Sequence, residues 1–121
     1  MCAALDLRQR GHAVALVERR QYPFHRVCGE YISNEVLPYL HRLGADPAPL
    51  GPAAISRLLV SSPAGRTLTA PLDLGGFGIS RYLLDDYLYR LATDRGVRVL
   101  QKTTVADVTF SGEQDAHVVV L

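Results

Sequence analysis

Two hydrophobic patterns alternate along the first part of the chain. Residues 1–10 have the composition of a helix, which Gly11 would end. Residues 13–18 form a continuous apolar run that closes with a carboxylate, and such a run is typical of a central strand in a parallel sheet. Residues 19–33 are irregular but contain aromatic and aliphatic side chains, which favours a functional loop over disorder. A helix with a polar cap is predicted to follow over about 34–43.

The middle of the chain predicts a β-hairpin. Residues 54–60 and 67–72 form two strands around a Ser-Pro-Ala-Gly turn at 62–65. The residues before the hairpin, 46–52, form a short Pro-rich connector. The residues after it, 74–78, form a Gly-rich run that is expected to be flexible and whose spacing fits no phosphate-binding fingerprint.

The last third predicts a long helix and then strands. Residues 81–95 carry apolar side chains at helical spacing, and Ser80 can cap this helix. A short strand is expected over 97–100. Residues 103–110 and 116–121 alternate around a turn and predict a second hairpin. Helices that alternate with strands indicate an α/β fold.

Composition narrows the class of protein. The 121 residues suit one small domain or a piece of a larger one, with the 48% apolar and 21% charged residues of an ordinary globular protein. The net charge of +1 gives no electrostatic case for nucleic acid. Two cysteines make neither a disulfide framework nor a metal cluster, which favours a reducing, cytoplasmic setting. No apolar run approaches the ~20 residues of a transmembrane helix.

Four motifs occur in a fixed order. They are Gly11–Glu18, Arg26–Glu30, Ser80–Asp85, and Gly96-Val97 with Val105 beyond. In this order and at these separations, the sequence resembles the flavin-dependent oxidoreductases of the geranylgeranyl reductase group. That group belongs to the superfamily of p-hydroxybenzoate hydroxylase-like and halogenase-like flavoproteins. The resemblance covers essentially the whole chain, and the ordered set is more specific for the superfamily than for any one reaction.

The resemblance implies a partial FAD/NAD(P)-binding domain of the Rossmann type, three-layered and with parallel strands. Residues 1–46 and 78–121 would form its cofactor-binding part, and the hairpin at 54–72 would be inserted from the substrate domain. The family pattern opens with a strand and a G-x-G-x-x-G turn that binds the diphosphate, and its third glycine would fall just before Met1. We therefore expect a fragment, or a mis-started reading frame, of a flavoprotein truncated at both ends.

Three residues are predicted to contact the adenosine end of FAD. A carboxylate after a buried parallel strand is where a dinucleotide fold binds a ribose, and the alternative is a solvated strand-end acid. The resemblance implies that Glu18 accepts hydrogen bonds from both ribose hydroxyls. Arg19 is predicted as a neighbouring contact. Val105, placed in the strand after 97–100, would pack on the adenine and read the base edge with its main chain; the alternative is a core valine.

Two arginines are predicted on the phosphate side. The resemblance implies that Arg26 reaches the phosphate or ribose side of the flavin, whereas the alternative is a surface charge in a loop. Arg81 opens the long helix, where a cation is unfavourable for the helix dipole and needs a local reason. The resemblance supplies contact with the FAD phosphate or ribityl chain. Asp85, one turn later, is predicted to pair with Arg81 as structural support.

Three consecutive loop residues are predicted beside the flavin. Val27 and Gly29 would contribute backbone contacts, and glycine suits a close approach of the backbone to a ligand. Cys28 would lie near the flavin ring and the substrate cavity, or would be a small buried hydrophobe. No catalytic acid or base and no metal ligand set is identified.

The function predicted from the resemblance is that of a FAD-dependent oxidoreductase, with NAD(P)H as a candidate electron donor. A reductase of isoprenoid or polyene double bonds competes with a monooxygenase or halogenase acting on an aromatic substrate. A lipid substrate would bring peripheral membrane contact. From a different class comes a non-catalytic α/β fragment that cannot bind FAD without the Gly-rich turn. An NAD-binding domain needs the same turn and leaves the Arg26-Cys28-Gly29 loop unexplained.

Overall fold

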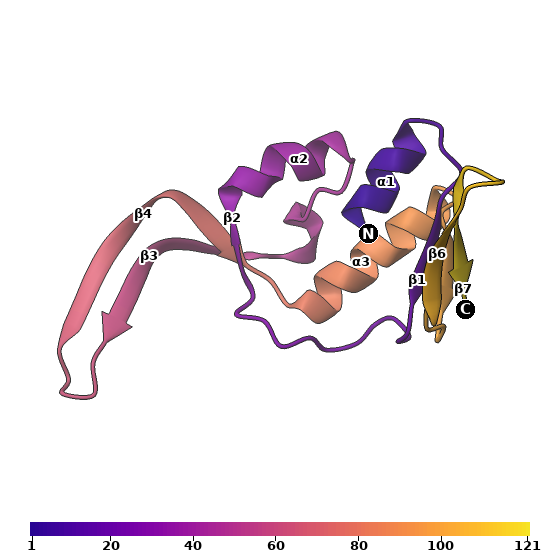
Figure 1. Ribbon diagram of the computed structural model, residues 1–121. Coiled ribbons are helices and arrows are strands. Elements are labelled where there is room, and N and C mark those ends of the chain that lie inside the picture. The colour runs from indigo at the N-terminus through magenta and orange to yellow at the C-terminus, as the bar shows by residue number, and fades with distance from the viewer. The chain divides into compact units, whose positions relative to one another are not determined.

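The computed structural model describes residues 1–121 and shows a mixed α/β protein (Figure 1). In chain order the elements are α1 (Cys2–Gln9), β1 (Ala15–Glu18), β2 (Tyr31–Ser33), η1 (Asn34–Val36), α2 (Leu37–Arg42), η2 (Ala48–Leu50), β3 (Ala53–Ser61), β4 (Thr67–Gly78), α3 (Arg81–Asp94), β5 (Arg98–Gln101), β6 (Asp107–Ser111) and β7 (Ala116–Val120). The predicted α/β class, with parallel strands and an inserted antiparallel hairpin, is confirmed. None of the helices has both the length and the apolarity needed to cross a membrane.

The chain divides into two units. The first unit consists of Met1–Phe24 and Leu88–Leu121, and the second unit consists of His25–Tyr87. The first contains the parallel pair of strands and the C-terminal hairpin, and the second contains the three-stranded antiparallel sheet.

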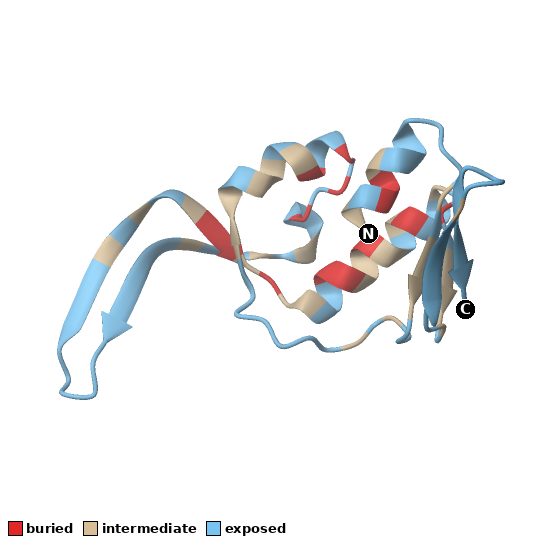
Figure 2. Ribbon diagram, viewed as in Figure 1, coloured by how far each residue is buried: buried red, intermediate tan, exposed pale blue.

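The parallel pair β1–β5 organises the first unit. The strands pair in register from Ala15 opposite Arg98 to Glu18 opposite Gln101, so that they end together. The buried side chains of this unit come from α1, the second half of α3 and the entry to β5, where Figure 2 shows red segments. They are Ala4, Leu5, Leu88, Ala92 and Val97.

The C-terminal end of α3 is closed by a glycine and an arginine. Gly96 has a φ of +82°, the left-handed conformation that ends many helices. Arg8 of α1 donates from Nε to the main-chain oxygen of Arg95 (2.9 Å) and from Nη1 to that of His12 (3.3 Å). One guanidinium group therefore satisfies carbonyl groups that follow two different helices.

The C-terminal hairpin is shorter than its pattern predicts. β6 begins at Asp107 and pairs with β7, and the residues from 103 to 106 are irregular. The prediction that Val105 lies in a strand is therefore wrong. Lys102 has a φ of +55°, which turns the chain away from the line of β5, and Thr103 donates its N–H to the main-chain oxygen of Glu18 (3.2 Å).

The second unit is built on the sheet β2–β4–β3, in which both neighbours run antiparallel to β4. Its buried apolar side chains come from α2 and the turn after it, the end of β4 and the residue that follows it, and the start of α3. They are Leu40, Leu43, Ala45, Phe77, Ile79 and Leu84. The outer part of the β3–β4 hairpin contributes nothing to this core and is exposed over most of its length, with Ala70 and Leu72 half-buried (Figure 2).

The Gly-rich run at 74–78 belongs to β4 and is not the flexible segment that was predicted. Residues 72–75 bulge out of the hairpin opposite Ser56, and pairing with β3 resumes at Gly76. Side chains bond the carbonyls of the bulge, since Asn34 Nδ2 donates to the Leu74 oxygen (2.8 Å) and the Tyr31 hydroxyl to that of Gly75 (3.2 Å). The glycines give space for these partners to approach the backbone.

The loop after β1 and the helix that follows it match their predictions in part. Residues 19–30 are irregular, but the last three residues of the predicted loop form β2. The predicted helix over 34–43 occurs as the 3₁₀ turn η1 followed by α2, with Ser33 Oγ accepting from the Glu35 N–H (3.4 Å). Three residues form a strand only through their pairing with β4, which no local pattern reveals.

Candidate functional site

Two arginines and one carboxylate form a cluster in the second unit. Arg81, the first residue of α3, donates from Nε to Asp85 Oδ1 (3.0 Å) and from Nη2 to Oδ2 (2.9 Å). Arg26, from the irregular loop, donates from Nε to Asp85 Oδ2 (3.1 Å). The pairing of Arg81 with Asp85 agrees with its helical spacing, whereas the second arginine comes from 59 residues away. We call these three residues the Arg–Asp–Arg cluster.

Burial differs sharply within the Arg–Asp–Arg cluster. The side chain of Asp85 is 10% exposed, and those of Arg26 and Arg81 are 39% and 34% exposed. Two guanidinium groups on one carboxylate leave a formal charge of +1, carried by the two groups that solvent reaches. An exposed cationic surface above a buried acid suits the binding of an anion.

The surroundings of Arg81 shift its pKa. Partial burial lowers the pKa of Arg81, but hydrogen bonds to Asp85, the charge of that carboxylate and the neighbouring Cys28 side chain together raise the pKa above its ordinary value. Arg81 is therefore charged at every pH that a protein meets. The carboxylate of Asp85 also offsets the unfavourable interaction of the Arg81 charge with the dipole at the helix N-terminus.

Cys28 is exposed, so that the interpretation of this residue as a small buried hydrophobe is wrong. Its Sγ accepts a hydrogen bond from the Glu30 N–H (3.4 Å) and interacts with the Arg81 guanidinium. Cys28 thus interacts with Arg81, and Arg26 shares the Asp85 carboxylate with Arg81, although the loop and the helix are far apart in the sequence.

Glu18 lies at the carboxyl end of β1 in the first unit, and its side chain is partly exposed. Its Oε1 accepts a hydrogen bond from the Arg20 N–H (3.0 Å). The chain leaves β1 in a turn around this carboxylate, and the end of β5 lies alongside at Gln101. This is the edge at which doubly wound sheets bind ligands.

A polar and aromatic cluster next to Glu18 was not predicted. Gln101 accepts the Tyr22 N–H at Oε1 (2.6 Å) and donates from Nε2 to the Tyr89 hydroxyl (2.8 Å), and the Tyr22 and Tyr89 rings stack at 5.2 Å. The ring of Phe24 lies 5.0 Å from that of Tyr22. These contacts fix the residues that follow the strand.

The four remaining predicted site residues are exposed. Arg19 follows Glu18 at the surface, and Val27 is fully exposed. A Cβ atom added to Gly29 would meet no atom within 4 Å, so the chain itself does not require glycine there. Val105 is 41% exposed, which excludes its interpretation as a core valine.

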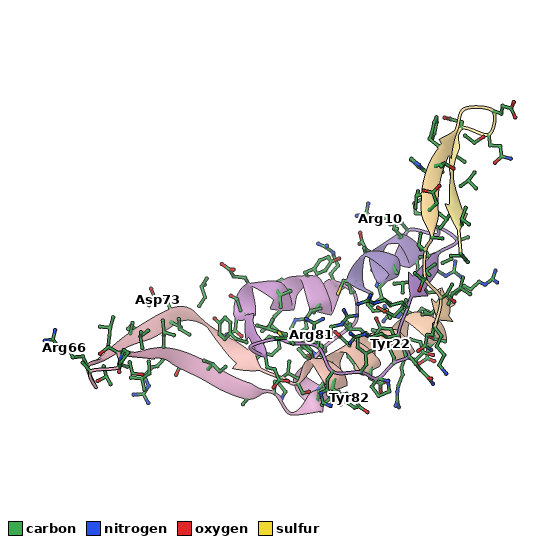
Figure 3. The ribbon with its side chains drawn as sticks, turned by 60° about the horizontal axis from the view of Figure 1, so that its bottom comes forward. Arg10, Tyr22, Arg66, Asp73, Arg81 and Tyr82 are labelled. Carbon is green, nitrogen blue, oxygen red and sulfur yellow. The ribbon has the colours of Figure 1, made fainter.

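Figure 3 shows Arg81 and Tyr82 together where α3 begins. The ring of Tyr82 lies 4.7 Å from that of His25, beside Arg26 in the loop. No group of three or more His, Cys, Asp or Glu side chains is arranged to hold a metal ion.

The residues present fit the groups of FAD within each unit. Glu18 offers a partly exposed carboxylate acceptor at the end of a parallel strand, and Arg26 and Arg81 offer charged donors for a phosphate group.

Several solved structures share the fold of this chain. The flavin-dependent halogenase CmlS matches 98% of the chain with a TM-score of 0.77 and 25% identity, over 25% of its own length.

The chain has a flavoprotein fold. A flavoprotein/dehydrogenase from Cytophaga hutchinsonii matches 98% of the chain with a TM-score of 0.74 and 18% identity. A geranylgeranyl bacteriochlorophyll reductase-like protein from Thermoplasma acidophilum matches 92% with a TM-score of 0.69 and 19% identity. The chain spans 34% and 29% of these two proteins, respectively. No protein-family model and no curated protein matches the sequence.

This flavoprotein fold agrees with the parallel-strand, FAD-binding architecture predicted from the sequence. Because the likeness is to the fold, it leaves open which reaction such a protein would catalyse.

Proposed function

We propose that the chain supplies part of the FAD-binding domain of a FAD-dependent oxidoreductase. The observation that carries the proposal is the parallel pair β1–β5, whose first strand ends at Glu18 in a chain with a flavoprotein fold. In this proposal residues 1–46 and 78–121 bind the cofactor, and the hairpin at 54–72 belongs to the substrate side.

Glu18 is proposed to bind the adenosine ribose. A carboxylate accepts from two neighbouring hydroxyls, and a charged acceptor makes the stronger hydrogen bonds. An acid here suits FAD, because its adenosine ribose carries no phosphate that the acid would repel. Arg19 and the main chain of Val105 are proposed as further contacts with the adenosine.

The Arg–Asp–Arg cluster is proposed to bind a phosphate group of FAD. Arg26 and Arg81 present guanidinium groups that solvent reaches, and guanidinium groups bind phosphate oxygens in pairs. The backbone of Val27 and Gly29 and the thiol of Cys28 are proposed to lie beside the flavin. The exposure of all three residues leaves them accessible to a ligand.

Bound FAD would supply the redox chemistry, and the residues of the chain would bind and orient it. We propose an apolar or aromatic small-molecule substrate, on which the reaction is a reduction or a monooxygenation, with NAD(P)H as the electron donor. The matched structures include a halogenase, a flavoprotein/dehydrogenase and a reductase-like protein, which supports the oxidoreductase class and no single reaction.

A non-catalytic α/β protein that does not bind FAD is the second candidate. It is favoured by the lack of a G-x-G-x-x-G sequence, the turn that binds the diphosphate in dinucleotide-binding folds, within residues 1–121.

Titration of the purified chain with FAD separates the two candidates. Flavin fluorescence is recorded as protein is added, and retention of FAD is measured by gel filtration. Quenching that saturates, with flavin eluting in the protein peak, supports the FAD-binding proposal. Unchanged fluorescence, with the chain folded by circular dichroism, supports the non-catalytic protein.

A further inference from the structure

Asp85 is the buried charged residue of the chain, with 7% of its surface exposed. Both of its carboxylate oxygens accept hydrogen bonds from guanidinium groups, at distances of 2.9–3.1 Å. An unpaired carboxylate is costly to bury, so its burial depends on these arginines. The positions of the two guanidinium groups depend in turn on Asp85, because both donate hydrogen bonds to its carboxylate.

The two arginines differ in how firmly the backbone alone holds them beside Asp85. Arg81 is held at its base by α3, whereas Arg26 belongs to an irregular loop and crosses to α3 through Asp85. A mobile arginine side chain loses rotamer entropy when a ligand immobilises it. A side chain that is already held loses less, and the ligand then binds more tightly.

Asp85 could act on a bound anion through its negative charge or by positioning the arginines, and the two roles predict opposite effects of its removal on anion binding. If Asp85 acts on an anion only through its charge, its removal strengthens anion binding, since a repelling carboxylate is lost. If it acts by holding Arg26 beside Arg81, its removal weakens binding although the net charge becomes more positive.

We infer that Asp85 is a positioning residue for a bound phosphate group. It holds Arg26 and Arg81 side by side, so that N–H groups from both meet the oxygens of one phosphate of a diphosphate. The inference rests on the proposed function and deepens it, because it names the residue that holds the two proposed phosphate-binding arginines in place.

The test measures binding of inorganic pyrophosphate to the folded chain by isothermal titration calorimetry at low ionic strength. We expect Asp85→Asn to weaken pyrophosphate binding about tenfold relative to the unmodified chain. Asp73→Asn, which removes an exposed carboxylate of β4, is the matched control and should leave the affinity unchanged or slightly raised. Arg81→Gln should abolish measurable binding.

An affinity that is unchanged or higher in Asp85→Asn overturns the inference, as does a wild-type chain that binds no pyrophosphate. If Asp85→Asn does not fold by circular dichroism, Asp85→Glu replaces it. Asp85→Glu keeps the negative charge but moves the carboxylate by one methylene. A positioning role therefore predicts weaker pyrophosphate binding, whereas a role through charge alone predicts unchanged binding. FAD titration is read separately. Pyrophosphate binding without FAD binding contradicts the proposed function and leaves the role of Asp85 standing.

Discussion

Arg8 Nε lies 2.9 Å from the main-chain oxygen of Arg95, which joins the first helix of the chain to the end of its last helix. The same guanidinium lies against Gly96, where an added Cβ would come within 3.3 Å of Arg8 Nη2. A charged donor at the negative end of a helix is favourable for the helix dipole. The first unit therefore depends on a residue that its hydrophobic pattern does not single out.

Removal of this guanidinium tests its contribution. We expect Arg8→Ala to lower the free energy of unfolding by about 1 kcal/mol, because two carbonyl groups lose a charged donor at a partly solvated site. Urea denaturation followed by circular dichroism measures the change. Arg10→Ala is the control: Arg10 makes an exposed ion pair with Asp6 (3.3 Å), and its loss should cost less than about 0.5 kcal/mol. Equal effects of the two variants would contradict the prediction.

Close packing against Gly76 gives a second prediction. A Cβ atom at this position would lie 2.6 Å from Tyr31 Cζ and 2.7 Å from the main-chain oxygen of Ile32. Because the oxygen is backbone, relief requires β2 to move away from β4, and we expect Gly76→Ala to cost about 1–3 kcal/mol. Gly112→Ala, where the added atom meets nothing within 4 Å, is the control and should change stability little. Thermal denaturation of the two variants makes the comparison.

The ribose assignment predicts the behaviour of Glu18. We expect Glu18→Gln to weaken FAD binding about tenfold, since the amide replaces a charged acceptor by a neutral one. Riboflavin, which lacks the adenosine, should bind both proteins equally. Glu113→Gln removes an exposed carboxylate between β6 and β7 and serves as the control. Loss of riboflavin and FAD binding in parallel would show that Glu18 does not contact the ribose.

The ionisation of Arg81 predicts a pH dependence. Its pKa is raised by Asp85 and Cys28 despite partial burial, so its charge, and the stabilisation that comes with it, persist below the ordinary arginine pKa and are lost only above it. Arg81→Lys introduces a group with an ordinary pKa of about 10.4, which begins to lose its charge near pH 10. The ratio of wild-type to Arg81→Lys affinity for pyrophosphate should therefore rise from about pH 8 to about pH 10, and the titration of the ligand itself cancels in this ratio. A constant ratio would show that the charge at position 81 does not bind the anion.

Local patterns predicted the elements that carry their own signals. β1 was recognisable as a continuous run of apolar residues, and α3 was recognisable because its apolar residues recur at the helical period. The pairing of Arg81 with Asp85 followed from the same helical period.

Contacts between distant residues were not predictable in this way. β2 is a strand only because three residues pair with β4, and Gly76 is glycine because the ring of Tyr31 lies on it. Arg26 reaches Asp85, and Tyr22 reaches Gln101, across 59 and 79 residues. The resemblance singled out Arg26 as a cofactor contact, but neither its spacing nor its polarity indicates its partner.

The exposed β3–β4 hairpin favours self-association of the chain, which affects binding measurements. β3 is an edge strand whose outer N–H and C=O groups have no strand beside them, and Leu58, Leu59, Val60 and Leu68 of the hairpin are 50–66% exposed (Arg66 marks its tip in Figure 3). An open edge with apolar neighbours is a template for self-association through intermolecular strand pairing. At high concentration such aggregates would scatter light and trap flavin non-specifically, so dilute, freshly filtered protein is the appropriate sample for the fluorescence experiment.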